Sequence, residues 1–87
     1  MPSFQPEARP VTINGKTVYL RGTLEYDVNT GARIATSIRD VLTYRDVVSR
    51  AGVSGTPTVT YTDVNGTRTI GPTDSVQPLD SSSFVVK

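Results

Sequence analysis

The chain has 87 residues, and nine basic against eight acidic side chains give it a formal charge of +1. It is long enough for one compact domain, and its balanced charge gives no electrostatic footprint for nucleic acid or for an anionic membrane. The chain contains neither cysteine nor histidine. This excludes a disulfide, a thiolate zinc site, a cysteine nucleophile and the commonest general base near neutral pH.

Apolar residues make up 36% of the chain and recur in clusters between turn signals, which indicates a thin folded core rather than disorder. No apolar run approaches the roughly 18 residues that span a bilayer. The proline-containing start has no hydrophobic core like that of a signal peptide. We therefore expect a cytoplasmic protein, or a component of a larger particle such as a virion.

Residues 1–10 contain three prolines and no periodic apolar pattern. Such a pattern is typical of an extended terminal segment outside the fold. The sequence therefore predicts a mobile N-terminal arm over residues 1–10 and a single domain over residues 11–87.

The first predicted elements are two strands around Asn14-Gly15. Residues 11–13 and 16–20 alternate between apolar and polar side chains, and Asn and Gly tolerate the positive φ angles that a type I′ turn requires. Thr12 and Tyr19 lie on one face of this hairpin. The residues predicted to face the core are Val11, Ile13, Val18 and Leu20.

A third strand is predicted over residues 23–28, where apolar side chains again alternate with polar ones. Residues 32–42 fit two patterns, because their apolar side chains match both a helix face and one face of a strand. Of the two, the sequence favours a strand that pairs back onto residues 23–28.

One helix is predicted over residues 44–51. Thr43 precedes it as an N-cap, Asp46 stands at the third helical position for a capping box, and Gly52 follows as a C-cap. A helix of two turns is not stable alone, so it must pack against a sheet. The predicted buried stripe consists of Tyr44, Val47, Val48 and Ala51.

The second half of the chain predicts another hairpin and two short strands. β-Branched and aromatic residues fill residues 58–62, and a second Asn-Gly pair at 65–66 turns the chain into residues 67–70. Short strands are expected at 75–76 and 84–86. Two hairpins therefore flank one helix.

The order hairpin, helix, hairpin and final strand is the order that a β-grasp fold needs. Local motifs follow the same order, in the segments Leu42-Thr43-Tyr44-Arg45-Asp46-Val47-Val48, Ala51-Gly52, Thr58-Val59-Thr60-Tyr61, Gly71, Asp74-Ser75-Val76 and Phe84-Val85-Val86. These segments resemble the ubiquitin-like modules of bacteria and phages known as multiubiquitin domains. The resemblance implies an α+β class, ubiquitin-like β-grasp fold, in which a mixed sheet has one short helix across one face.

The sequence departs from that family at three places. Residues 21–41 are longer than the family's path from the first hairpin to the helix, and residues 80–82 stand where an Asp-Gly turn is expected. Residues 85–87 lack the paired glycines that let an activating enzyme reach a flexible carboxyl terminus. A conjugatable ubiquitin-like modifier is therefore the least favoured reading.

No group of residues predicts catalysis, a metal site or a cofactor. The serine hydroxyls have no histidine to activate them. Each of the six aspartates falls at a turn or a cap, where its carboxylate bonds backbone amides, and none has calcium-loop spacing. We expect neither an enzyme nor a bound cofactor, metal or small-molecule substrate.

The remaining candidates are uncharged side chains on the sheet face away from the helix. In ubiquitin-like folds this face is where partners usually dock, and tyrosine suits an interface because it combines apolar area with a polar tip. The predicted protein-binding residues are Thr12, Tyr19, Thr60 and Thr62. A shift of the alternation by one residue would invert this assignment.

The sequence thus favours a non-catalytic, ubiquitin-like protein-interaction module whose partner is another protein. The alternative is a small structural protein of a phage particle that assembles by strand addition. The two hypotheses differ in oligomeric state, which the sequence leaves open.

Overall fold

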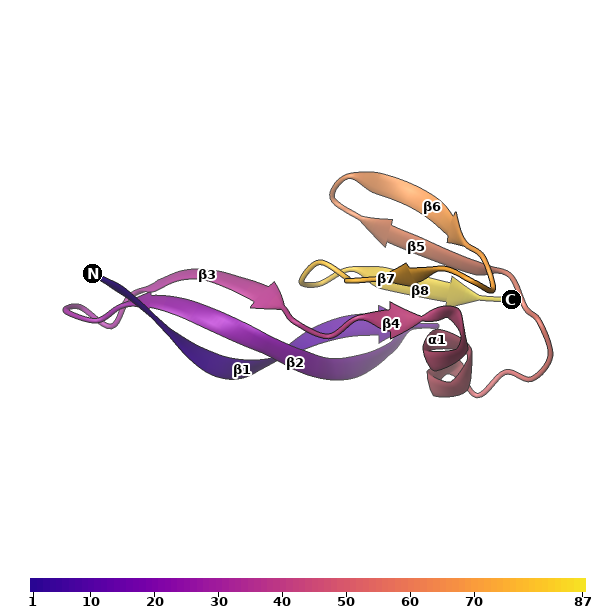
Figure 1. The fold of residues 1–87 in the computed structure, drawn as a ribbon, viewed down its shortest axis with the longest axis horizontal. Helices are drawn as coiled ribbons and strands as arrows, with labels where there is room; N and C mark the ends of the chain where they lie inside the picture. Colours follow the sequence, from indigo (N-terminus) through magenta and orange to yellow (C-terminus); the bar gives the residue numbers. More distant parts are fainter.

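The computed structural model describes all 87 residues as one elongated molecule of 50 × 23 × 22 Å (Figure 1). No helix in it is long and apolar enough to span a membrane. In chain order the elements are β1 (Pro2–Ile13), β2 (Lys16–Asp27), β3 (Arg33–Ile38), β4 (Leu42–Thr43), α1 (Tyr44–Ala51), β5 (Val59–Asp63), β6 (Gly66–Ile70), β7 (Ser75–Val76) and β8 (Ser83–Val86).

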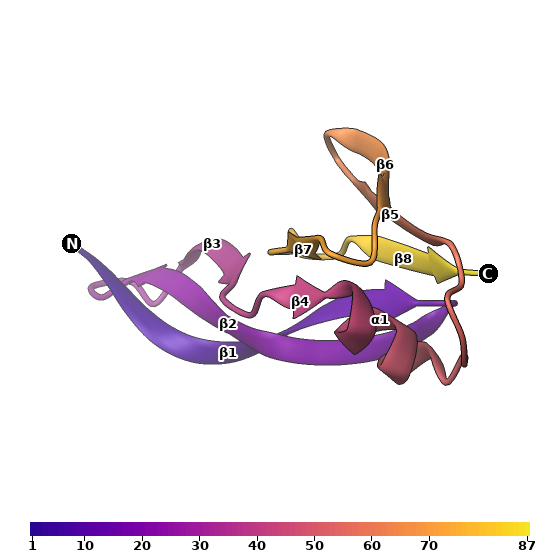
Figure 2. The ribbon, with the colours of Figure 1, turned by 45° about the vertical axis from the view of Figure 1, so that its right-hand side comes forward.

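Six strands form one mixed sheet in the order β3-β2-β1-β8-β5-β6. The pair β1 and β8 is parallel, and every other neighbouring pair is antiparallel. The short strands β4 and β7 pair separately, and β4 leads directly into α1. Figure 2 shows α1 near the end of the sheet at which β1 turns into β2. The fold is therefore of the α+β class, a mixed sheet with one short helix.

The hairpin of β1 and β2 is the longest feature of the molecule. Its strands have twelve residues each and pair along their whole length. Asn14 and Gly15 have φ angles of 51° and 80°, which confirms the predicted turn with positive φ at both positions. The strand predicted over residues 23–28 is the second half of β2 rather than a separate element.

The prediction of a mobile N-terminal arm over residues 1–10 is wrong, because residues 2–10 form most of β1 and pair with β2. On its other side β1 meets β8 only at Thr12 and Ile13. The backbone nitrogens of Pro2 and Pro6 point to that unpaired side, where a missing N–H removes no ladder hydrogen bond. Prolines are therefore compatible with this strand, and the sheet extends over residues that the sequence places outside it.

Residues 32–42 contain β3, which pairs antiparallel with β2. This confirms the strand that pairs back onto residues 23–28 rather than the helix. Together with residues 2–9 of β1 and 21–27 of β2, it forms a three-stranded part of the sheet that projects beyond α1 (Figure 1). We call this part the hairpin extension.

The helix α1 begins and ends where its caps predict. The Thr43 hydroxyl accepts a hydrogen bond from the Asp46 backbone N–H at 3.1 Å, and the Asp46 carboxylate accepts one from the Thr43 N–H at 3.0 Å. Gly52 has a φ of 71°, in the left-handed region. The capping box and the C-cap are therefore confirmed, and the helix buries Tyr44, Val47 and Val48.

The core lies between α1 and one face of the sheet, where fourteen buried apolar residues form one cluster. Its members come from both hairpins, from the helix and from the last strand. The most deeply buried, at 1% exposure or less, are Val11, Ile13, Val47, Val59 and Phe84.

The second hairpin is also confirmed. Asp63 pairs with Gly66, so the two turn residues are Val64 and Asn65 rather than the predicted Asn65 and Gly66, and Gly66 begins β6. The strands β7 and β8 lie where the two short strands are predicted. Because β8 lies between β1 and β5, it joins the two hairpins into one sheet.

Candidate protein interface

The face of the sheet opposite α1, here called the open face, carries the four predicted binding residues. In β2, Leu20 is 2% exposed whereas its neighbour Tyr19 is 67% exposed. The side chains of β5 alternate in the same sense, between buried core residues and more exposed threonines. The predicted register is therefore confirmed, and the open face carries Thr12, Tyr19, Thr60 and Thr62.

Five hydroxyl side chains form a row across five strands of the open face. The strand register places Thr17 opposite Thr12, and Thr12 beside Ser83. It continues from Ser83 to Thr62 and from Thr62 to Thr67. The last two hydroxyl oxygens are hydrogen-bonded at 2.9 Å. Since neighbouring strands are about 4.8 Å apart, the row places hydroxyl groups at regular intervals across the sheet.

A second row follows on the same face, where Thr69, Thr60 and Val85 lie side by side. Neither row contains a charged side chain. The nearest arginine on this face of β2, Arg21, already bonds Asp40 through its Nε at 2.9 Å. The two rows therefore offer hydroxyl donors and acceptors with some apolar surface, and a partner that covers them meets no charged side chain within the rows.

Five residues of these rows were not among the predicted site residues: Thr17, Thr67, Thr69, Ser83 and Val85. Each follows from the same alternation that placed the others, since it stands two residues from a predicted member or opposite one. What the sequence does not contain is the order of the strands, and the rows appear only when that order is known.

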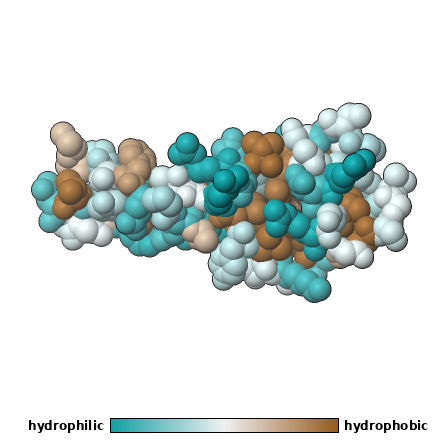
Figure 3. Space-filling view, turned by 60° about the horizontal axis from the view of Figure 1, so that its bottom comes forward, coloured by the Kyte–Doolittle hydropathy of each residue, from teal (hydrophilic) through white to brown (hydrophobic).

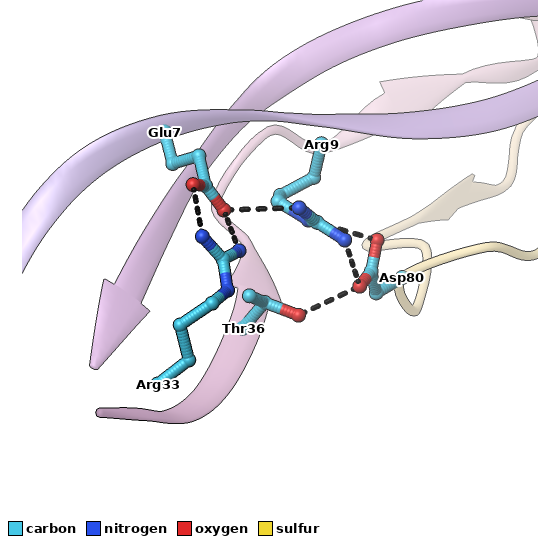
Figure 4. A network of polar contacts seen from close by, with 5 residues as sticks. All are labelled: Glu7, Arg9, Arg33, Thr36 and Asp80. Atoms are coloured by element: carbon cyan, nitrogen blue, oxygen red, sulfur yellow. Dashed lines mark hydrogen bonds and ion pairs between the residues drawn. The ribbon is translucent and has the colours of Figure 1, made fainter. Parts of the chain in front are cut away.

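A different polar cluster ties the hairpin extension to the segment before β8 (Figure 4). The Arg9 guanidinium donates to both carboxylate oxygens of Asp80, at 3.1 and 2.8 Å, and to Glu7 at 2.9 Å. Arg33 donates twice to Glu7, at 3.0 and 2.7 Å. The Thr36 hydroxyl donates to Asp80 at 2.6 Å. We call these five residues the ionic network.

The arginines of the ionic network hold the pKa of its carboxyl groups below their ordinary values. At Asp80 the main cause is the hydrogen bond from Arg9, with Thr36 adding to it. At Glu7 the hydrogen bonds from Arg33 lower the pKa most. Because these charges satisfy one another, the cluster acts as a structural tie rather than as a reactive site.

Replacing Asp80 by asparagine should lower the free energy of unfolding at pH 7 by about 1 kcal/mol. The variant loses a charge-assisted pair with Arg9, at a site open enough to water to screen part of that pair. Folding lowers the pKa of Asp80 from its ordinary value of 3.8. The carboxylate therefore contributes its full stabilisation at pH values above 3.8, and this stabilisation is lost as the pH falls through the lowered pKa of the folded state. Urea titrations should show the difference closing as the pH falls below 3.8.

The matched control for this prediction is Glu25→Gln, which removes a carboxylate that makes no ion pair. Its free energy of unfolding should stay within about 0.5 kcal/mol of the wild type at every pH. The role given to the Asp80 carboxylate is contradicted if the free energies of unfolding of Asp80→Asn and the wild type differ as much at the lowest pH as at pH 7.

The structure brings together no group of three or more acidic side chains that could hold a metal ion. No protein-family model matches the chain, and comparisons with curated proteins and with solved structures find no similar protein. The resemblance to multiubiquitin domains therefore stays a prediction from the segments quoted for it.

Proposed function

We propose that this protein is a non-catalytic, ubiquitin-like β-grasp module that binds another protein through the open face of its sheet. The order β2-β1-β8-β5-β6, with the parallel pair β1 and β8 in the middle, supports this fold. The single helix packs across the other face and buries the aliphatic residues beneath it. β3 and the long ends of β1 and β2 are additions to that plan.

The observation that carries the proposed function is the uncharged composition of the two rows on the open face, with Tyr19 beside the first of them. Cores of protein interfaces are depleted in charged residues and enriched in tyrosine; here the two rows contain no charged side chain, and one tyrosine, Tyr19, lies exposed on the same face. Tyr19 is two-thirds exposed and lies opposite Pro10, so a partner can cover its ring at little cost in side-chain entropy. The first hydroxyl row, which begins at Thr17 beside Tyr19, provides hydrogen bonds that fix the orientation of the partner.

Replacing Tyr19 by glutamate should weaken binding of the partner by about thirtyfold, the effect of losing an interface residue worth about 2 kcal/mol. The immobilised wild-type protein is first used to purify its binding partner from the cells of origin. The dissociation constants of the wild type and the variant are then measured by titration calorimetry with that purified partner.

Ile34→Glu serves as the matched control, because Ile34 is also an exposed apolar residue, at 55%, and the substitution adds the same charge on the hairpin extension. Its dissociation constant should equal that of the wild type. If Tyr19→Glu binds as tightly as the wild type and Ile34→Glu does not, the interface lies on the hairpin extension and the proposed site is wrong.

An assembly protein is a second candidate, and the hairpin extension favours it. The extension exposes Phe4 at 65% and Ile34 at 55%, and Val28, in the loop that joins β2 to β3, is also 55% exposed. Figure 3 shows hydrophobic side chains at this end of the molecule. Exposed apolar residues at the end of an elongated subunit suit contacts between copies. Light scattering over a range of concentrations distinguishes the two: a constant monomer mass supports the binding module, and a ring or higher assembly that Phe4→Ser dissociates supports the second candidate.

A further inference from the structure

The outer edge of β6 has free backbone hydrogen-bonding groups. Thr58 and Lys87 exchange two backbone hydrogen bonds of 2.9 Å, so the even-numbered residues of β5 bond to β8. The odd-numbered residues of β5 therefore bond to β6. Their partners in β6 are even-numbered, since Tyr61 pairs with Arg68 and Val59 with Ile70. The N–H and C=O groups of Thr67 and Thr69 point away from the sheet, where β6 has no neighbour.

The free edge of β1 is protected in a way that β6 is not. The Thr12 N–H donates to the Ser82 carbonyl at 3.0 Å, so the even-numbered residues of β1 point away from β2. Over residues 2–9, Pro2 and Pro6 occupy two of the four outward positions and remove their N–H groups. Prolines at outward positions block the addition of another strand. The sequence of β6 contains no proline.

Two other outer edges differ from that of β6. The Gln77 side-chain amide donates to the outward carbonyl of Ile38 on β3, at 2.8 Å. The unpaired stretch of β2, at Thr17 and Tyr19, carries the tyrosine assigned above to the open-face interface. At β6, by contrast, the free peptide groups lie beside a hollow on the core side of the sheet.

This hollow has a volume of about 360 Å³, and its lining includes Tyr61, Arg68 and Leu79. The Arg68 guanidinium lies 5.4 Å from the centre of the Tyr61 ring and makes no ion pair. The one carboxylate in the lining, Asp63, accepts the N–H of Asn65 at 2.8 Å. The edge of β6 therefore carries an arginine that lies over an aromatic ring and pairs with no carboxylate of the chain.

We infer that the edge of β6 accepts an extended segment of a partner protein as a seventh, antiparallel strand with an acidic side chain opposite Arg68. Thr67 and Thr69 supply the backbone hydrogen bonds of the new ladder. The acidic side chain lies on the same face as Arg68 and forms a cross-strand ion pair beside the hollow. This contact uses the outward backbone groups of Thr67 and Thr69 rather than their side chains, which lie on the open face, and it does not depend on the proposed function.

A second copy of this chain fits the same edge poorly. The antiparallel self-pairing in which Thr67 of each copy bonds Thr69 of the other places Arg68 of one copy directly opposite Arg68 of the other. Like charges directly opposite each other destabilise a strand pair. The edge therefore favours a separate, acidic segment over its own copy.

The probe for this inference is the capped pentapeptide Thr-Val-Glu-Val-Thr, with its lysine analogue Thr-Val-Lys-Val-Thr as the matched control. In titrations of isotope-labelled protein, the acidic peptide should shift the amide resonances of Thr67 and Thr69 and slow their hydrogen exchange. The lysine peptide should bind about fivefold more weakly, the effect of a cross-strand charge pair worth about 1 kcal/mol. Arg68→Gln should remove this preference, whereas Arg45→Gln, which removes an exposed charge on the helix, should leave it unchanged.

N-methylated peptides test the ladder without changing the protein. With glutamate opposite Arg68, the two valines stand opposite Thr67 and Thr69, and their N–H groups face β6. Methylating both valine nitrogens should abolish binding, whereas methylating the glutamate nitrogen should leave it unchanged. Equal binding by both methylated peptides, shifts confined to other strands, or no binding at millimolar peptide would overturn the inference. A dimer of the protein alone that Thr69→Pro abolishes would also overturn it, in favour of a second copy at this edge.

Discussion

Replacing Gly22 by alanine should lower the free energy of unfolding by about 2–3 kcal/mol, because it over-packs the centre of the hairpin extension. Gly22 is buried and lies between Glu7 of β1 and Ile38 of β3. An added Cβ would overlap the backbone carbonyl oxygen of Ser37 and lie 2.6 Å from Cγ of Arg9. The carbonyl belongs to the paired strand β3, so the clash is relieved only by moving that strand. Urea denaturation followed by circular dichroism measures the loss.

Hydrogen exchange tells where the Gly22→Ala variant is weakened. The amides of β3 should lose protection, whereas those of β5, on the far side of β8, should keep it in conditions where the protein stays folded. Thr17→Ala, an exposed change in the same strand, should alter the free energy of unfolding by no more than about 0.5 kcal/mol. If Gly22→Ala is as stable as this control, the close approach of β3 to β2 is wrong.

Replacing Phe84 by alanine should cost about 3–5 kcal/mol of stability, the largest effect expected for any single change. Phe84 is 1% exposed, and its ring centre lies 4.9 Å from that of Tyr61 in a tilted arrangement. It is carried by β8, the strand that joins the two hairpins. A small domain has about 5–15 kcal/mol of stability in all, so this one cavity removes a large part of it. Thermal and urea denaturation provide the measurement.

Phe84→Leu provides a readout if the alanine variant does not fold, because it keeps most of the buried volume and should lose less stability than Phe84→Ala. Val64→Ala is the control, since Val64 is 91% exposed in the second turn, and its effect should stay within about 0.5 kcal/mol. A loss below about 1 kcal/mol for Phe84→Ala would show that β8 does not lie in the core.

Features that depend on neighbouring residues could be predicted from the sequence. The capping box of Thr43 and Asp46, the turn at Asn14-Gly15 and the alternation in residues 58–62 are each decided within a few positions. The alternation also placed Tyr19 on the correct face, because strand periodicity separates the two faces without reference to the partner strand.

Features that depend on distant residues could not be predicted. Residues 2–10 form a strand because β2 is long enough to pair with all of them, and the prolines fit only because that side of β1 has no neighbour. The ionic network joins Arg9 to Asp80 across 71 positions. The hydroxyl rows likewise require the order of five strands, and no local pattern contains that order.

The open face as the site of protein binding is tested most directly by mapping the purified partner onto the isotope-labelled protein by nuclear magnetic resonance. The proposal predicts that the largest shifts on binding fall on Thr12, Tyr19, Thr60 and Thr62, with smaller ones at the other members of the two rows. Shifts confined to the exposed side of α1 or to the far end of the hairpin extension, with these four residues unchanged, would contradict it.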